Sequence, residues 1–471
     1  MRDKEDAVSR RSFLEGMVAT GVAAQLAPLA AQAGAAASFR PNIVYLHSHD
    51  SGRYLEPYGA AAPTPHLARL AEQGTLFRNA FSAAPTCSPS RAALLTGMCA
   101  HSNGMVGLAN RGFVLNDYRK VMVHTLRAAG YTSVLGGLQH IANDPTVIGY
   151  DHILQQEKLS AVYVAPAAAA FLDSRPAGPF FLDVGFFETH REFPEATAED
   201  NADYCALPRP IPDTPVTRGD FARFRASARV MDAGAGQVLE ALERNGYAEN
   251  TLVLSTTDHG IAFPRMKCDL TDDGWGVSMM MRGPRIAAGA VCDALISQLD
   301  IFPTFCDYLG IERPAWLEGK SFLPVLAGQT AEINEEVFAE VNYHASYEPK
   351  RAVRTTRWKY IRRYGDRKTP VLPNCDDSPS KSEWLRAGWG RQILDQEGLY
   401  DLVFDPTEHA NLIHDPGHRE IADQMRGRLR RWMEATNDPL LHGRVAAPAG
   451  AVVNDPREIS PREATEPADT R

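Results

Sequence analysis

Apolar runs of strand length recur along the chain and alternate with helical segments. Residues 42–47 form one such run, and similar runs cover residues 180–187 and 251–257. Runs that are apolar at nearly every position are typical of strands buried on both faces. A helix predicted over residues 225–245 leads into the run at 251, and strands joined by helices form parallel sheets. The sequence therefore predicts an α/β fold, with a mostly parallel central sheet flanked by helices.

The pattern changes near residue 337, where strands such as 357–363 follow one another without intervening helices. A last predicted helix has an apolar face made of Ile421, Met425, Leu429 and Trp432. We therefore expect an α/β domain over residues 38–336 and a smaller C-terminal α+β subdomain over residues 337–440. Residues 441–471 hold four prolines among mixed charges and few apolar groups, which predicts a disordered tail.

The charge balance excludes one class of function. The chain has 49 lysines and arginines against 58 aspartates and glutamates, a net charge of −9. A nucleic-acid-binding protein needs a basic face to meet phosphates, so we expect no nucleic-acid partner. The seven cysteines are scattered and form no C-x-x-C pair, which argues against a disulfide scaffold and against a zinc ribbon.

The N-terminal residues have the layout of an export signal. Arg10 and Arg11 precede an Ala/Gly-rich stretch that ends in small residues near positions 33 and 37. This order is typical of a twin-arginine signal peptide. A transmembrane anchor is the alternative, but glutamines and a proline interrupt the apolar run. We expect residues 1–37 to direct export to the periplasm, without a membrane anchor.

The segment from Cys87 to Gly97 carries the strongest chemical signal; it reads Cys-Ser-Pro-Ser-Arg-Ala-Ala-Leu-Leu-Thr-Gly. It is predicted to be a turn followed by a helix, with Cys87 at the helix N-terminus. The N–H groups and the helix dipole favour an anion at that end. Arg91 lies one turn later on the same side, where it can pair with an oxyanion. The alternative is a buried cysteine beside a helix cap.

This string resembles the signature of the sulfatase family, C-x-P-S-R-x-x-x-L-T-G, at every fixed position. Further strings that are similar to the family occur, in order, at 42–52, 64–71, 257–260, 299–304 and 399–402. The resemblance covers most of the chain after residue 37 and implies that residues 38–336 form the catalytic domain. It also implies that a maturation enzyme converts Cys87 to formylglycine, whose hydrate is the nucleophile.

The resemblance implies one hard divalent cation, calcium or alternatively magnesium, in an oxygen-rich site. Asp50 and Asp258 each follow a predicted strand, and the carboxyl ends of parallel strands meet at one edge of a sheet. Carboxylate oxygens suit such a cation. Cys87, once modified, and His259 complete the implied ligands. His49 stands where most sulfatases carry an aspartate, so it is either a ligand that softens the metal preference or a side chain that points elsewhere.

Three further residues match catalytic positions of the family. His140 and His190 match its two histidines, and Lys267 matches a lysine. Leu138 stands where the family has another lysine, so one sulfate-binding cation is missing or is supplied from elsewhere. His101 is expected to be structural or to line the pocket.

The implied reaction has two steps. A metal-bound hydroxyl of the hydrate attacks sulfur, while Arg91, Lys267 and the cation neutralise the sulfuryl oxygens. His190 protonates the leaving group and His140 takes the proton of the remaining hydroxyl, or the two roles are exchanged. The expected activity is hydrolysis of a sulfate ester or a sulfamate.

Two other functions stay open. Some phosphodiester and phosphonate monoester hydrolases share the C-x-P-S-R motif. A periplasmic binding relative without turnover would explain the departures at His49 and Leu138, although the intact set of the other site residues argues against it.

The strings at 49–53 and 137–140 resemble those of bacterial proteins similar to heparan N-sulfatases. This resemblance implies a sulfated saccharide as substrate, with the sulfate on oxygen or on the nitrogen of an amino sugar. Arg53 and Arg111 either contact a uronate or sulfate of the sugar or are ordinary surface arginines.

Overall fold

The computed structural model describes residues 39–468. The predicted export signal, residues 1–37, lies outside the described residues. Within residues 39–468, no helix combines the length and the apolar composition that crossing a membrane requires.

An eight-stranded sheet forms the centre of the fold. Neighbouring strands run parallel except at β8, which is antiparallel to both of its neighbours. The predicted mostly parallel sheet is thus confirmed. In order across the sheet, the strands are β5 (His152–Ile153), β4 (Thr132–Gly137), β6 (Phe180–Gly185), β1 (Asn42–His47), β7 (Thr251–Thr256), β8 (Met279–Arg282), β2 (Thr75–Phe77) and β9 (Ala290–Cys292).

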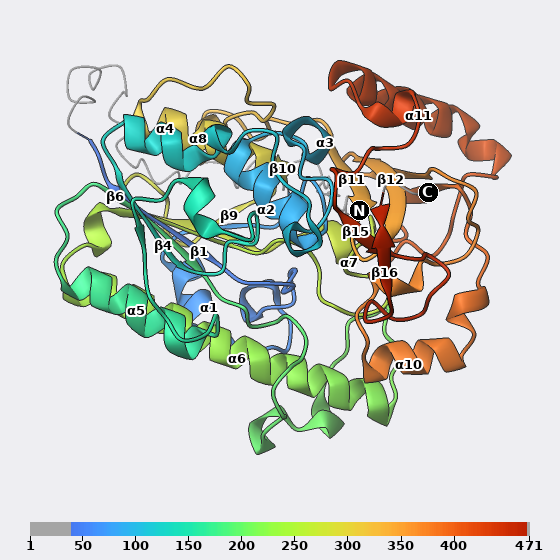
Figure 1. Ribbon diagram of the computed structural model, residues 1–471, viewed down its shortest axis with the longest axis horizontal. Helices are drawn as coiled ribbons and strands as arrows, with labels where there is room; N and C mark the ends of the chain where they lie inside the picture. The colour runs from blue at the N-terminus through green and yellow to red at the C-terminus, as the bar shows by residue number, and fades with distance from the viewer. Residues whose placement is uncertain (1–38, 469–471) are drawn as a thin grey trace, which may run out of the picture. The chain divides into compact units, whose positions relative to one another are not determined.

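Helices cover both faces of this sheet, as predicted (Figure 1). One face is covered by α1 (Pro65–Glu72), α5 (Ala161–Asp173) and α6 (Pro215–Arg244), whose apolar side chains join one core cluster with the strands. The other face carries α2 (Cys87–Thr96), α4 (Met122–Ala128) and α8 (Ile301–Leu309). Because both faces are covered, β1, β6 and β7 are buried at every position, which explains their unbroken apolar runs.

Helix α6 begins at Pro215, well before the predicted start near residue 225. Thr214 caps it, because its Oγ1 accepts the Thr217 N–H at 3.3 Å. Proline is also favoured at the first helical position, where no N–H partner is needed. The local capping chemistry therefore extends the helix beyond the apolar face from which it was predicted.

A second, antiparallel sheet begins where the sequence pattern changes. Its strands, in order, are β11 (Val337–Tyr343), β12 (Tyr347–Arg354), β13 (Trp358–Arg363) and β14 (Glu397–Asp401). Helix α11 (Arg419–Ala435) packs on this sheet through Ala422, Met425, Leu429 and Met433. Ile421 and Trp432 from the predicted apolar face are only partly buried at its edges.

The segment 441–468 is folded, so the prediction of a disordered tail is wrong for these residues. β15 (Val452–Asn454) and β16 (Thr465–Pro467) pair antiparallel. Asn454 is fully buried; its N–H donates to the Ala345 carbonyl at 2.8 Å, and its carbonyl accepts from Ser346 Oγ at 2.9 Å. Composition was misleading because hydrogen bonds to distant residues help to hold this segment in place, and composition does not indicate such bonds.

Candidate active site

The carboxyl ends of three central strands lie side by side at one edge of the main sheet. His47, at the end of β1, lies between Gly185 of β6 and Thr256 of β7 in the strand register. The loops after β1 and β7 carry Asp50 and Asp258, and the Asp50 N–H donates to Asp258 Oδ1 at 2.8 Å. Parallel pairing therefore brings the two aspartates together, as predicted.

Five buried side chains converge at this edge, and one ligand atom of each lies within 4.8 Å of all the others. They are the five predicted ligands, and together we call them the ligand cluster: His49, Asp50, Cys87, Asp258 and His259. Asp50 Oδ1 lies 2.6 Å from His49 Nδ1 and 3.2 Å from His259 Nε2. Asp258 Oδ2 lies 3.2 Å from the same His49 nitrogen. Carboxylate oxygens and imidazole nitrogens that face one point can hold a divalent cation.

His49 points into this cluster rather than away from it. Burial lowers the pKa of His49 to about 4, although Asp258 and Asp50 oppose this shift. The imidazole is therefore neutral near pH 7, which is the form that binds metals through a lone pair. Of the two orientations left open by the sequence, the structure has the one in which His49 faces the aspartates.

Two positively charged side chains, Lys267 and Arg91, pair with the carboxylates of Asp50 and Asp258. Lys267 Nζ lies 2.8 Å from Asp50 Oδ2, and Arg91 Nη2 lies 3.0 Å from Asp258 Oδ2. Burial alone would raise the pKa of Asp50, but Lys267 and neighbouring histidines hold this pKa well below its usual value. Burial alone would lower the pKa of Lys267, but Asp376 and Asp50 raise it well above its usual value. All four groups are therefore charged at neutral pH.

Cys87 is the first residue of α2, and its Sγ faces the cluster. Sγ lies 3.4 Å from His259 Nε2 and 3.9 Å from Asp50 Oδ1. Burial raises the pKa of the Cys87 thiol well above its usual range, and the nearby Lys267 only partly opposes this. Because the thiolate is the reactive form of cysteine, the unmodified side chain is a poor nucleophile.

Arg91 is oriented by residues that the sequence analysis did not single out. Its Nη1 donates to His47 Nδ1 at 2.6 Å, and its Nη2 donates to the Ser48 carbonyl at 2.9 Å. His47 Nε2 lies 2.9 Å from Asp183 Oδ1, so the imidazole donates to this carboxylate and accepts from Arg91. The sequence did hold a signal for the contact between His47 and Arg91, because His47 is a polar residue at the end of an otherwise apolar strand.

His190 lies beside the cluster, with its ring centre 4.5 Å from that of His49. Its Nδ1 donates to the Arg191 carbonyl at 2.5 Å. Its Nε2 is therefore left as the acceptor, 3.5 Å from Lys267 Nζ. The structure thus brings His190, Lys267 and the ligand cluster together, as the sequence analysis expected.

His140 lies farther out, with its ring centre 5.8 Å from that of His49. Its backbone is left-handed, with φ 53°. Such conformations are uncommon outside glycine and gather at functional sites. Its Nε2 is 3.1 Å from Asn110 Oδ1, and its Nδ1 has no hydrogen-bond partner among the described residues. Leu138, at the expected lysine position, is buried.

The C-terminal sheet and its connections contribute two side chains that the sequence analysis missed. His344 lies in the turn between β11 and β12, and its Nε2 is 4.0 Å from Cys87 Sγ. Asp376 precedes α10 (Pro379–Arg386), and its Oδ2 is 2.9 Å from Lys267 Nζ. Burial lowers the pKa of His344 well below its usual value, and the charge of Lys267 lowers it further. No motif surrounds either residue, so only the fold reveals them.

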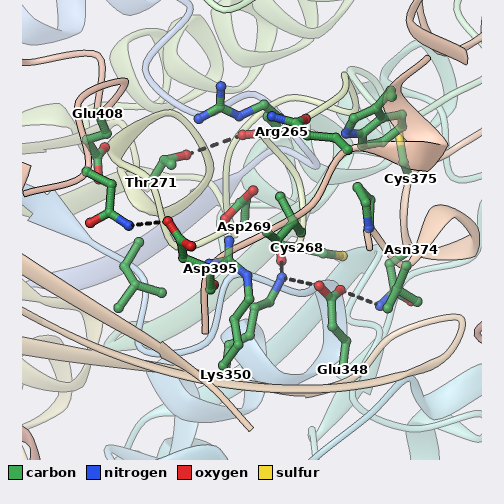
Figure 2. A pocket seen from close by; sticks show the side chains of 18 of the residues that line it. Arg265, Cys268, Asp269, Thr271, Glu348, Lys350, Asn374, Cys375, Asp395 and Glu408 are labelled. Carbon is green, nitrogen blue, oxygen red and sulfur yellow. Dashed lines mark hydrogen bonds and ion pairs between the residues drawn. The ribbon is translucent and has the colours of Figure 1, made fainter. Parts of the chain in front are cut away.

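Figure 2 shows how the loop that carries Lys267 is held against the C-terminal sheet. A pocket of about 260 Å³ lies between them. At its wall, Lys350 Nζ donates to the Cys268 carbonyl at 2.7 Å and pairs with Glu348 at 3.0 Å. Glu348 also accepts from Asn374 Nδ2 at 2.9 Å. This network connects the Lys267 loop to the segment that precedes Asp376.

Three other predicted residues have protein partners of their own. His101 Nδ1 lies 2.8 Å from Glu340 Oε1, which is the structural role expected for this histidine. The Arg53 guanidinium lies over the Phe81 ring, 4.8 Å from its centre. Arg111 donates to two backbone carbonyls, both at 3.2 Å. Each arginine is therefore engaged within the protein.

Comparisons with known proteins show the family of this chain. The Sulfatase family profile matches residues 41–311, and the profile described as N-sulphoglucosamine sulphohydrolase, C-terminal, matches residues 266–385. Human N-sulphoglucosamine sulphohydrolase is 30% identical over an alignment that covers 87% of this chain and 92% of that protein. An ulvan-active sulfatase of Formosa agariphila is 27% identical, with 85% and 76% covered.

The fold is also similar to that of a protein solved in complex with its substrate, D-glucosamine-2-N,6-O-disulfate. The TM-score is 0.68 at 18% identity, and the alignment covers 85% of this chain and 98% of that one. The profile match spans more than half of the described residues and includes Cys87, Asp50 and Asp258. The chain belongs to the sulfatase family.

Proposed function

We propose that this protein hydrolyses a sulfate ester or a sulfamate on a saccharide. The observation that carries the proposal is that Cys87, at a helix N-terminus, meets a buried cluster of two carboxylates and two imidazoles. Arg91 and Lys267 add two positive charges at the same place, and an anionic sulfuryl group needs such partners. The names of the relatives, N-sulphoglucosamine sulphohydrolase and ulvan-active sulfatase, support a sulfated saccharide as the substrate.

We also propose that Cys87 is converted to formylglycine by a maturation enzyme and that the cluster holds calcium or, alternatively, magnesium. The raised pKa of the buried thiol supports the modification, because the unmodified side chain would react poorly. The donor set supports a divalent cation, since Asp50 and Asp258 both present carboxylate oxygens to the same point. A cation held by Asp50 and Asp258 would make a hydroxyl of the nucleophile more acidic and would withdraw negative charge from the sulfuryl group.

Four side chains of the protein bind the sulfuryl group and transfer protons. Arg91 and Lys267 bind the sulfuryl oxygens and stabilise the charge that develops on them. His190 is held at Nδ1 by the Arg191 carbonyl and directs Nε2 toward the leaving group; the imidazolium form, which carries a second proton on Nε2, delivers that proton. His140 has an unpartnered Nδ1 that takes the proton released in the second step.

The substrate proposal predicts a clear order of activity in a panel of sulfated sugars. We expect sulfate release from N-sulfoglucosamine, and turnover of a simple aryl sulfate that is lower by about 10²-fold. The physical reason is Leu138: without the lysine at this position, affinity for the sulfate alone is weaker, and contacts with the sugar must compensate. Release of inorganic sulfate from N-, 2-O- and 6-O-sulfated mono- and disaccharides measures this order.

Two outcomes of the panel would change the proposal. Preference for a 6-O-sulfate with no release from N-sulfoglucosamine would exclude the sulfamidase activity but keep the sulfatase activity. An aryl phosphodiester is the control substrate, and its faster hydrolysis than any sulfate would contradict the proposed function.

We further propose that the protein reaches the periplasm through the twin-arginine route, which carries folded proteins and so allows Cys87 to be modified before export. Changing both Arg10 and Arg11 to lysine is expected to retain the protein in the cytoplasm. Cell fractionation followed by immunoblotting measures the distribution, and Arg2→Lys is the matched control. Unchanged periplasmic yield from the double variant would refute this route.

A further inference from the structure

His344 is the residue of the C-terminal sheet that reaches the nucleophile position. Among the described residues, three polar side-chain atoms lie within hydrogen-bond range of Cys87 Sγ, and they belong to His259, Asp50 and His344. His259 and Asp50 are part of the ligand cluster, whereas His344 is not. His344 is therefore available for a role other than metal binding.

The imidazole of His344 has unused hydrogen-bonding capacity. Its side chain is only 5% exposed, and its Nδ1 has no hydrogen-bond partner among the described residues. A buried polar nitrogen without a partner is unfavourable, and such atoms in native proteins call for an explanation. Nε2 is the nitrogen that faces Cys87 Sγ, at 4.0 Å, so a substrate that extends from Cys87 past the imidazole would supply a partner for Nδ1.

The turn that carries His344 is firmly held. The Ser346 N–H donates to Asn374 Oδ1 at 2.8 Å, and Ser346 Oγ donates to the Asn454 carbonyl at 2.9 Å. The His344 N–H itself donates to the Ser346 carbonyl at 3.2 Å. Two separate segments of the chain therefore fix this turn, which is how binding groups are kept in position.

We propose that His344 donates a hydrogen bond from Nε2 to a sulfuryl oxygen of the bound substrate, an inference that rests on the proposed function. Cys87 Sγ is attached to Cβ, as the nucleophilic oxygen would be, and the reacting sulfur must approach that position. An imidazole nitrogen 4.0 Å from Sγ is then within reach of the oxygens on that sulfur. His344 is thus a substrate-binding residue supplied by the second sheet.

This contact accounts for the missing lysine at position 138. Leu138 can offer no hydrogen bond to the sulfate, so the site has lost one donor relative to the family pattern. His344 supplies a donor from 206 positions further along the chain, since 344 − 138 = 206. Its Nδ1 is left to accept from a hydroxyl or an N–H of the sugar.

The test compares His344→Ala and His344→Gln with the wild type, because the glutamine amide can restore a donor near Nε2. For a sulfated sugar, we expect kcat to fall about 10²-fold in His344→Ala, as for loss of one oxyanion-binding donor, with about tenfold recovered in His344→Gln. Binding of inorganic sulfate to the unmodified, calcium-loaded Cys87 protein is measured by isothermal titration calorimetry. We expect affinity to fall about tenfold in His344→Ala.

His124→Ala is the matched control, since His124 is half-buried and its Nε2 bonds only the Ile148 carbonyl, at 3.0 Å. It should keep both kcat and sulfate affinity. Wild-type kcat and affinity in His344→Ala would overturn the proposal, as would equal losses in His344→Ala and His344→Gln. If His344→Ala lowers Tm, the alanine variant is set aside, and kcat and sulfate affinity of His344→Gln against the wild type decide whether His344 binds the substrate. If the wild type releases no sulfate from any sugar, the proposed function fails, and the calorimetric comparison still decides the role of His344.

Discussion

Replacing Cys87 by alanine is expected to reduce sulfate release by about 10⁴-fold or more, because the variant has no side chain that can become the nucleophile. The rest of the site would remain, since alanine removes only Sγ, which lies 3.4 Å or more from its polar neighbours His259, Asp50 and His344. Residual activity would then come from charge stabilisation by Arg91, Lys267 and the cation. Sulfate release from the best sugar of the panel measures the loss, with the protein produced beside a maturation enzyme.

The matched control is Cys292→Ala, which removes a thiol from β9 at the edge of the main sheet. This variant should keep its activity. Peptide mass spectrometry of the active wild type should also detect an aldehyde at position 87. Wild-type activity in Cys87→Ala would contradict the mechanism at its first step.

The sequence was sufficient where parallel pairing decides the geometry. β1 and β7 are recognisable as buried strands, and adjacent parallel strands place the residues after their carboxyl ends together. For this reason Asp50 and Asp258, 208 positions apart, could be predicted to meet. The helix N-terminus at Cys87 could also be predicted, but from a different signal, the local motif at residues 87–97.

The sequence was insufficient where contacts depend on tertiary packing. His344 and Cys87 are 257 positions apart, and His344 lies in the turn of an antiparallel hairpin. Which end of that sheet faces the main sheet is set by contacts such as Lys350 with the Cys268 carbonyl, which leave no periodic signal. The C-terminal tail was mispredicted for a related reason. Asn454 is buried and hydrogen-bonded to a distant turn, and the amino-acid composition of the tail does not indicate this contact.

The second large effect is expected for Asp258→Asn, which should lower both metal affinity and sulfate release, the latter by about 10³-fold. The change preserves size and leaves an oxygen to accept the Asp50 N–H at 2.8 Å. The change removes the negative charge and places an amide nitrogen near Arg91 Nη2. In the wild type, this Nη2 lies 3.0 Å from Asp258 Oδ2. Two donors would then face each other, so Arg91 would lose its ion pair with residue 258, although its contacts with His47 and the Ser48 carbonyl would remain, and the cation would lose a carboxylate.

Metal content and calcium affinity of purified Asp258→Asn separate these two losses from unfolding. Asp232→Asn is the matched control: Asp232 is equally buried, at 2% exposure, but it accepts N–H groups of His66 and Leu67 at the start of α1. This control should lose stability and keep its metal. Wild-type metal content in Asp258→Asn would show that the cation does not depend on this carboxylate, and the cluster at the ends of β1 and β7 would then need another role. Loss of metal in Asp258→Asn alone would instead place the cation at the carboxyl ends of these two strands, where their parallel pairing brings the aspartates together.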